Sequence, residues 1–282
     1  GYKDAIQNRE SSEGFDKTKY DLETMTLKTF RQAVAVTYDK ELFASTISPA
    51  RTGAYGLVGT AYLYNAAEGS RYRDTDQAKQ VLCDFYSVDT SQYASLDEAA
   101  ASITGYDPEK AKEYLAASGL NPADCGFALI CSDDTKLRAG QVIQSSLKEN
   151  LGIDVTLESM DLATYLDKTA VGDYEASIGG YTSSGVLPYA VGVYHSKSID
   201  GSNKTRTNEP AIDELIDKLQ ATLDPEENVK VVTELSKAVN ENCPQIPLYL
   251  RNNVRAYAKG LQGFNLNAGG NTFYEQMSWG EN

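Results

Sequence analysis

The sequence has 282 residues, and 26 lysines and arginines against 40 aspartates and glutamates give a net charge of −14. Hydrophobic residues make up 41%, which supplies enough apolar material for a folded core and excludes a disordered chain. Lysines and arginines are scattered and form no basic stripe along the sequence. This excludes nucleic acid as a partner, because a negatively charged duplex would repel a protein of net negative charge. No apolar run reaches the roughly 18 residues of a membrane-spanning helix.

The N-terminal part of the chain predicts short helices around one long loop. Residues 1–24 are polar and are interpreted as an exposed lead-in. Apolar residues at helical spacing follow Thr26, a candidate helix cap, and Asp39 is a second one. Residues 48–74 are rich in Gly, Tyr, Ser and Pro and predict a long loop, which is often functional. The predicted helices are 27–38, 39–47, 74–85 and 89–104.

Helices and strands alternate in the middle of the chain. Asp107 and Pro108 form a strong helix start, and Gly119 stands where a helix-ending glycine belongs. Residues 180–210 predict a second long loop. The other predicted helices are 135–150, 161–170, 210–222 and 225–240, and the predicted strands are 126–131, 153–158, 174–179, 245–249 and 255–257. This alternation predicts an α/β fold with a mixed sheet flanked by helices.

No catalytic or metal centre stands out among the polar residues. His195 is the sole histidine and is interpreted as a loop residue, because no Ser or Cys shows the partners of a catalytic triad. A lone histidine and cysteines outside any CxxC pair predict no metal site. No glycine motif for nucleotides is present, and no cofactor is expected. Adjacent carboxylates, interpreted as solvated faces, occur at Asp133-Asp134, Asp213-Glu214 and Glu226-Glu227.

The four cysteines leave their redox state open. They are Cys83, Cys125, Cys131 and Cys243. Two disulfides or four buried free thiols are both compatible with the count. A bridge between Cys125 and Cys131 is disfavoured, because a strand separates its ends by about 20 Å and a disulfide needs about 7 Å.

Several segments of the chain carry recognisable patterns in a consistent order. They are FRQAVAVTYDKE at 30–41, YDPEKAKEYL at 106–115, LKENLGIDV at 147–155, NKTRTNEPAID at 203–213 and QIPLY at 245–249. Over about 26–265 these segments resemble the extracytoplasmic solute-binding proteins of peptide-type ABC importers (family 5), which show similar RQA, YDPEKAK, LKxxGIxV and PxIPLY patterns there.

The resemblance implies a type II periplasmic-binding-protein fold, in which two α/β lobes close over a ligand. The chain is then a fragment of a longer protein and is expected to bind ligand poorly alone. Residues 1–25 are interpreted as the lead-in from an absent first lobe, 26–240 as the second lobe, and 241–282 as a strand and tail returning to the first lobe. Such a protein is extracellular, a cell-surface lipoprotein with its anchor upstream, and its partners are ABC permease subunits.

The resemblance also places the ligand side. Gly179 and Gly180 follow a predicted strand, where glycine permits close approach of a ligand or of a packed neighbour. Peptide-binding members carry a Gly-Trp-x-x-Asp-type turn here, whose Asp neutralises the peptide's α-ammonium. Ser184 stands at that Asp position, so the carboxylate is absent and recognition of a free-amine peptide is disfavoured. A neutral, sugar-like or N-blocked ligand stays open, as does an acidic group supplied elsewhere. The candidate ligand residues are Gly180, Tyr181, Thr182, Ser183, Ser184 and Gly185, with Tyr55, Tyr62 and Tyr64 as further cleft or hinge candidates.

The predicted function is therefore non-enzymatic: binding of a peptide or another small solute for peptide transport by an ABC importer. Two alternatives stay open at this stage. One is an extracellular hydrolase that uses a carboxylate pair, and the other is a surface receptor or adhesin on the same fold.

Overall fold

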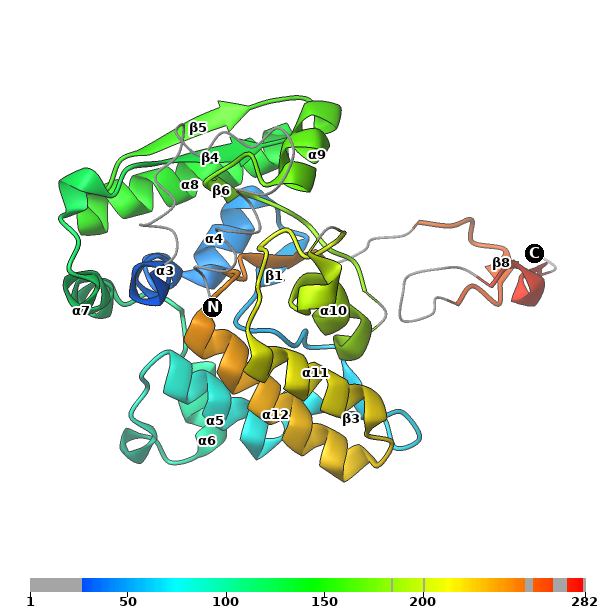
Figure 1. Ribbon diagram of the computed structural model, residues 1–282. Helices are drawn as coiled ribbons and strands as arrows, with labels where there is room; N and C mark the ends of the chain where they lie inside the picture. Colours follow the sequence, from blue (N-terminus) through cyan, green and yellow to red (C-terminus); the bar gives the residue numbers. More distant parts are fainter. Residues whose placement is uncertain (1–26, 184, 200, 252–255, 266–272, 281–282) are drawn as a thin grey trace.

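The computed structural model describes residues 27–183, 185–199, 201–251, 256–265 and 273–280. Its upper part in Figure 1 is a three-stranded sheet in the order β5-β4-β6, formed by β4 (Phe127–Cys131), β5 (Val155–Ser159) and β6 (Ala176–Ser177). All three strands are parallel, with Phe127 opposite Val155 and Leu129 opposite Ala176. The antiparallel pairs of the described chain lie in separate two-stranded ribbons. The α/β fold class is confirmed, and the expected mixed sheet is a parallel one.

Helices α8 (Asp134–Leu151) and α9 (Leu162–Val171) connect these strands. Helix α8 begins where the Asp133 carboxylate accepts the N–H of Lys136, and it ends at Gly152 with a φ of 72°. Such local capping signals explain why the sequence predicts this helix within one or two residues.

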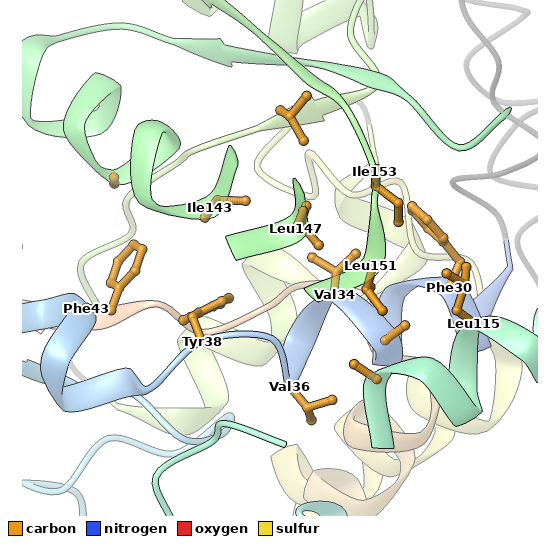
Figure 2. Close-up of a cluster of buried hydrophobic side chains, with 14 of the residues drawn as sticks. Phe30, Val34, Val36, Tyr38, Phe43, Leu115, Ile143, Leu147, Leu151 and Ile153 are labelled. Carbon is orange, nitrogen blue, oxygen red and sulfur yellow. The ribbon is translucent and has the colours of Figure 1, made fainter. Parts of the chain in front are cut away.

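The first hydrophobic core lies between α8 and three further helices: α3 (Lys28–Ala35), α4 (Lys40–Ile47) and α7 (Pro108–Ser118). Figure 2 shows Phe30, Leu115, Leu147 and Ile153 converging from these elements. Leu147 and Ile153 are fully buried, so this core anchors the sheet to the helices beneath it.

A second core forms the lower part of the molecule in Figure 1. Ile212, Ile216 and Leu235 are buried at its centre. The helices that contribute to it are α10 (Val186–Val193), α11 (Pro210–Ala221), α12 (Pro225–Asn242) and, through Ala78, α5 (Asp76–Phe85). Helix α6 (Leu96–Ala101) packs against α5 and contributes Ala99 to the first core. Helix α12 packs against both α5 and α11, so residues far apart in sequence share this core.

Short ribbons complete the described chain. Strand β1 (Arg51–Gly53) pairs antiparallel with β7 (Tyr249–Arg251), which joins segments from opposite ends of the sequence. The remaining pairs are β2 (Leu63–Asn65) with β3 (Ser70–Arg71), and β8 (Leu261–Gln262) with β9 (Ser278–Trp279). In Figure 1 the β8–β9 ribbon stands away from the body. Single 3₁₀ turns lie at Tyr72–Asp74, Thr90–Gln92, Pro122–Asp124, Ser196–Ser198 and Tyr274–Gln276.

Both predicted long loops contain regular structure. The 48–74 segment holds β1, β2, β3 and a 3₁₀ turn, and the 180–210 segment holds α10. Helix α10 was missed because Pro188, Gly192 and its β-branched residues disfavour a helix locally, whereas burial of one face stabilises it. The predicted strand at 245–249 is formed only from Tyr249 onward, and Tyr257 lies outside any strand.

Some expectations fall outside the described residues. The lead-in at 1–25, the cap at Thr26 and Arg255 are among them. The division at residues 26 and 241 stays a prediction. Among the described helices, none is long and apolar enough to cross a bilayer.

Candidate functional site

The candidate ligand turn begins at the carboxyl end of β6, the edge where open parallel sheets bind ligands. Ile178 N–H donates to Ile130 O at 3.2 Å, and the Tyr165 hydroxyl donates to Ile178 O at 3.0 Å. These bonds hold the start of the turn against the sheet. Gly180 is exposed, and a β-carbon added there would meet nothing within 4 Å. Close packing therefore does not explain this glycine.

Tyr181 lies directly after this glycine and is 46% exposed. Its ring meets Tyr189 of α10 edge to face, with centroids 5.3 Å apart and planes at 86°. Its hydroxyl lies over Gly192, where a β-carbon would overlap it. The ring is thus held from the α10 side while part of its surface stays accessible.

The aromatic contact continues inward from Tyr189. Tyr189 and Tyr194 meet edge to face at 5.8 Å, and their hydroxyls both donate to Gln245 Oε1, at 2.8 and 2.9 Å. Burial raises the pKa of Tyr189, which keeps this hydroxyl protonated as a donor. The candidate site is therefore connected to the segment that follows α12.

The rest of the turn is polar and short-range in its contacts. Thr182 is exposed. The Ser183 hydroxyl donates to Gly185 O at 2.9 Å, and it accepts the Gly185 N–H at 3.4 Å. This loop leads into α10, whose N-cap is Gly185. Ser184, the residue at the Asp position of peptide-binding relatives, lies outside the described residues.

The three tyrosines of the 48–74 segment separate into different environments. Tyr62 lies beside the turn, because a β-carbon on Gly185 would lie 4.0 Å from its Cε2. Its hydroxyl donates to Asn228 Oδ1 at 3.1 Å, and burial raises its pKa. Tyr64 packs against the second core. Tyr55 packs against the first core, with its hydroxyl 3.3 Å from Glu41, and burial followed by that carboxylate raises its pKa.

His195 is buried, so the interpretation as an ordinary loop residue is incomplete. Its Nδ1 accepts the N–H of Lys197 at 3.2 Å, which leaves Nε2 to donate to Asp217 at 3.3 Å. The neighbouring Ser196 hydroxyl donates to Asp213 rather than to the imidazole. These contacts give His195 a structural role, in which it holds the end of α10 against α11.

The paired carboxylates serve local structure. Asp133 caps α8 and pairs with Lys136 at 2.8 Å. Glu227 lies in the first turn of α12 and pairs with Lys230 at 3.0 Å. The described chain contains no group of three His, Cys, Asp or Glu side chains that could hold a metal ion.

All four cysteines are buried and free, so the disulfide alternative is wrong and the free-thiol alternative is confirmed. Burial raises the pKa of both Cys131 and Cys243 to about 11. The thiols of Cys131 and Cys243 are therefore protonated at neutral pH, which makes them poor nucleophiles.

The sequence analysis did not identify three residues that support the candidate site around Tyr181. They are Tyr189, Gly192 and Gln245. Residues 186–193 carried a signal, since Val186, Ala190 and Val193 recur at helical spacing and are all buried. Once that helix is placed, Tyr189 and Gly192 follow. Gln245 reaches the site through a tertiary contact, which has no local signal.

Comparison with known proteins decides the family. Residues 15–201, more than half of the chain, match the bacterial extracellular solute-binding proteins, family 5 Middle. The chain belongs to this family. Among curated relatives, it is 27% identical over 174 residues to the probable D,D-dipeptide-binding periplasmic protein DdpA of Escherichia coli, covering 60% of this chain and 33% of that protein. It is 23% identical over 175 residues to the oligopeptide-binding protein OppA of Bacillus subtilis, covering 60% and 32%.

A solved structure gives the same fold. The periplasmic binding protein DppA from Helicobacter pylori, in complex with the peptide STSA, matches with a TM-score of 0.68 at 15% identity. That match covers 94% of this chain and 46% of the other. This family 5 chain thus spans about half the length of that neighbour and about a third of the two curated relatives.

Proposed function

We propose that this chain is the second, ligand-binding lobe of an extracytoplasmic solute-binding protein that delivers a peptide or related solute to an ABC importer. Its partners are the permease subunits and a first lobe of the same protein. A lipid anchor holds the whole protein at the cell surface. The observation that carries the proposal is Tyr181, a half-exposed ring held at the carboxyl edge of the sheet in a family 5 chain.

The ligand chemistry follows from the turn. An aromatic face supplies stacking area to a planar amide or a sugar ring. The family resemblance implies a carboxylate at the position of Ser184 that neutralises a peptide's α-ammonium, and an unpaired buried ammonium is costly. We therefore expect an N-blocked peptide, a saccharide or another neutral solute.

The test is a thermal-shift screen of the full-length protein against free-amine peptide pools, N-acetylated peptides, oligosaccharides and nickel. A ligand at 100 times its Kd adds about 2.7 kcal/mol to the native state, which gives a clear shift. We expect shifts with the blocked or neutral probes. A shift with free-amine peptides would contradict the argument from Ser184.

Tyr181→Ala tests the site itself. We expect it to weaken binding of any responding probe about tenfold, the equivalent of one lost aromatic contact. Tyr106→Ala is the matched control, because Tyr106 is 47% exposed and lies away from the turn, bonded to Asn150. Equal affinities in the two variants would remove Tyr181 from the site. Hydrolysis of a probe that depended on one carboxylate would support the enzyme alternative instead.

A further inference from the structure

Helix α10 has a notch at Gly192, and Tyr181 fills it. A β-carbon built on Gly192 would overlap the Tyr181 hydroxyl and lie 3.2 Å from its Cζ. Gly192 is buried, whereas Tyr181 is 46% exposed. The bulk of any side chain at 192 would therefore displace the tyrosine, whose other side is open.

A second contact from α10 holds the Tyr181 ring. Tyr189, three residues before Gly192 on the same helix, meets Tyr181 at 86° with centroids 5.3 Å apart. Its own hydroxyl is held by Gln245 at 2.8 Å. The ring of Tyr189 and the backbone at Gly192 therefore both contact Tyr181 from the α10 side.

The backbone does not require this glycine. Gly192 lies inside α10 and does not adopt the left-handed conformation that favours glycine. Glycine is also a weaker helix former than alanine. The local benefit of a glycine at this position is therefore the close approach of Tyr181.

We propose that Gly192 is a positioning residue for ligand recognition. Because it has no side chain, the Tyr181 hydroxyl packs against its backbone, and this contact, the seat, turns the free face of the ring toward the ligand. This inference rests on the proposed function for its final step, recognition, and on geometry alone for the seat. Gly192 acts through Tyr181 and needs no contact with the ligand.

The seat can be tested without any ligand. N-acetylimidazole acetylates accessible tyrosine hydroxyls, and mass spectrometry of the full-length protein reports each site. Gly192→Ala is expected to raise the acetylation rate of Tyr181 several-fold, because the new methyl group pushes the hydroxyl out of the notch. Tyr106 is the internal control, and its rate is expected to stay unchanged. An unchanged rate at Tyr181 in a folded Gly192→Ala variant overturns the proposal.

The role of Gly192 in ligand recognition is tested with a double variant that should restore binding. The probe is the N-acetylated peptide pool. Gly192→Ala is expected to weaken probe binding about tenfold, as loss of the aromatic face would. Tyr181→Phe removes the overlapping hydroxyl and leaves only a tight contact, so Gly192→Ala/Tyr181→Phe is expected to bind nearly as well as Tyr181→Phe alone. Circular dichroism checks that every variant folds.

The outcomes separate the two proposals. A faster Tyr181 acetylation with unchanged probe affinity overturns the positioning role while keeping the proposed function. Loss of affinity without rescue in the double variant also overturns it, because the damage then lies elsewhere in α10. A parent protein that binds none of the screened probes contradicts the proposed function, and the acetylation rates still decide the seat.

Discussion

Lys40 is a fully buried lysine without an ion pair in the described part of the chain. Its Nζ donates to Tyr38 Oη at 3.1 Å and to Pro247 O at 3.0 Å, and it lies 4.2 Å from the centroid of the Tyr38 ring. Burial lowers its pKa to about 7, and the smaller effect of nearby Cys243 opposes that shift. A base this deeply desolvated makes the stability of the fold depend on pH.

The sign of that dependence follows from proton binding. The unfolded chain keeps a lysine pKa near 10.4, so it binds more protons than the folded chain above about pH 7. The contribution of Lys40 to the free energy of unfolding therefore rises with pH from 7 upward, by about 1.5 kcal/mol between pH 7 and 8.5. Below pH 7 both states are protonated, and this slope flattens.

Lys40→Met should abolish this rise, and urea denaturation at pH 7.0 to 8.5 measures it. The quantity compared is the difference in slope between variant and parent, because the thiols of the unfolded chain ionise within this window while Cys131 and Cys243, with pKa values near 11, stay protonated, and this opposing effect is the same in both proteins. Lys112→Met is the control, since Lys112 is an exposed lysine paired with Glu109 on α7, and it should keep the parent slope. A Lys40→Met variant with the parent slope contradicts the assignment.

At the scale of elements, helix ends were predictable because their signals are local. Asp107, Pro108 and Gly119 bound α7 as the sequence indicates, with the Asp107 carboxylate accepting the Lys110 N–H at 2.9 Å. Helix α10 has no such local agreement, since Gly192 argues against it and burial of Val186, Ala190 and Val193 stabilises it. The sequence therefore indicates the candidate turn but not the helix that supports it.

Gly152 gives a clean test of one helix end. It closes α8 with a φ of 72°, and a β-carbon there would meet nothing within 4 Å. Gly152→Ala should therefore lower the free energy of unfolding by about 1 kcal/mol through backbone conformation alone. Gly59→Ala is matched in free space but lacks a positive φ, and it should change stability by less than about 0.5 kcal/mol. Equal effects in urea titrations would rule out the conformational explanation.

At the scale of the whole molecule, the contacts that the sequence conceals are those between distant segments. Strands β1 and β7 pair across about 200 residues, and Gln245 reaches Tyr189 across 56. No local sequence signal, such as a hydrophobic period or a capping residue, predicts either contact. The candidate site at Gly180 rests on the family resemblance and stays a prediction, whereas the hydrogen bond from Tyr189 to Gln245 is visible only in the three-dimensional arrangement.

Arg31 provides the strongest of these long-range contacts. It is 8% exposed, and its Nε and Nη2 donate to the carbonyl groups of Cys243 and Asn242 at 3.0 and 2.5 Å. These carbonyls end α12, where a cation also complements the helix dipole. The side chain therefore joins α3 to the segment that leads into Gln245 and β7.

Arg31→Met should lower the free energy of unfolding by about 2–4 kcal/mol, because one buried and one partly buried charge-assisted hydrogen bond are lost and the buried acceptor stays desolvated. Arg31→Lys should recover only part of the loss, since an ammonium lacks the planar fork that reaches both carbonyls. The comparison variant is Gln32→Ala, whose exposed amide donates to Glu241 O at 3.2 Å and should contribute less than about 0.5 kcal/mol. Urea midpoints at an unchanged denaturant slope report these differences, and an Arg31→Met midpoint equal to that of Gln32→Ala would show that α3 and the end of α12 are held together by apolar packing instead.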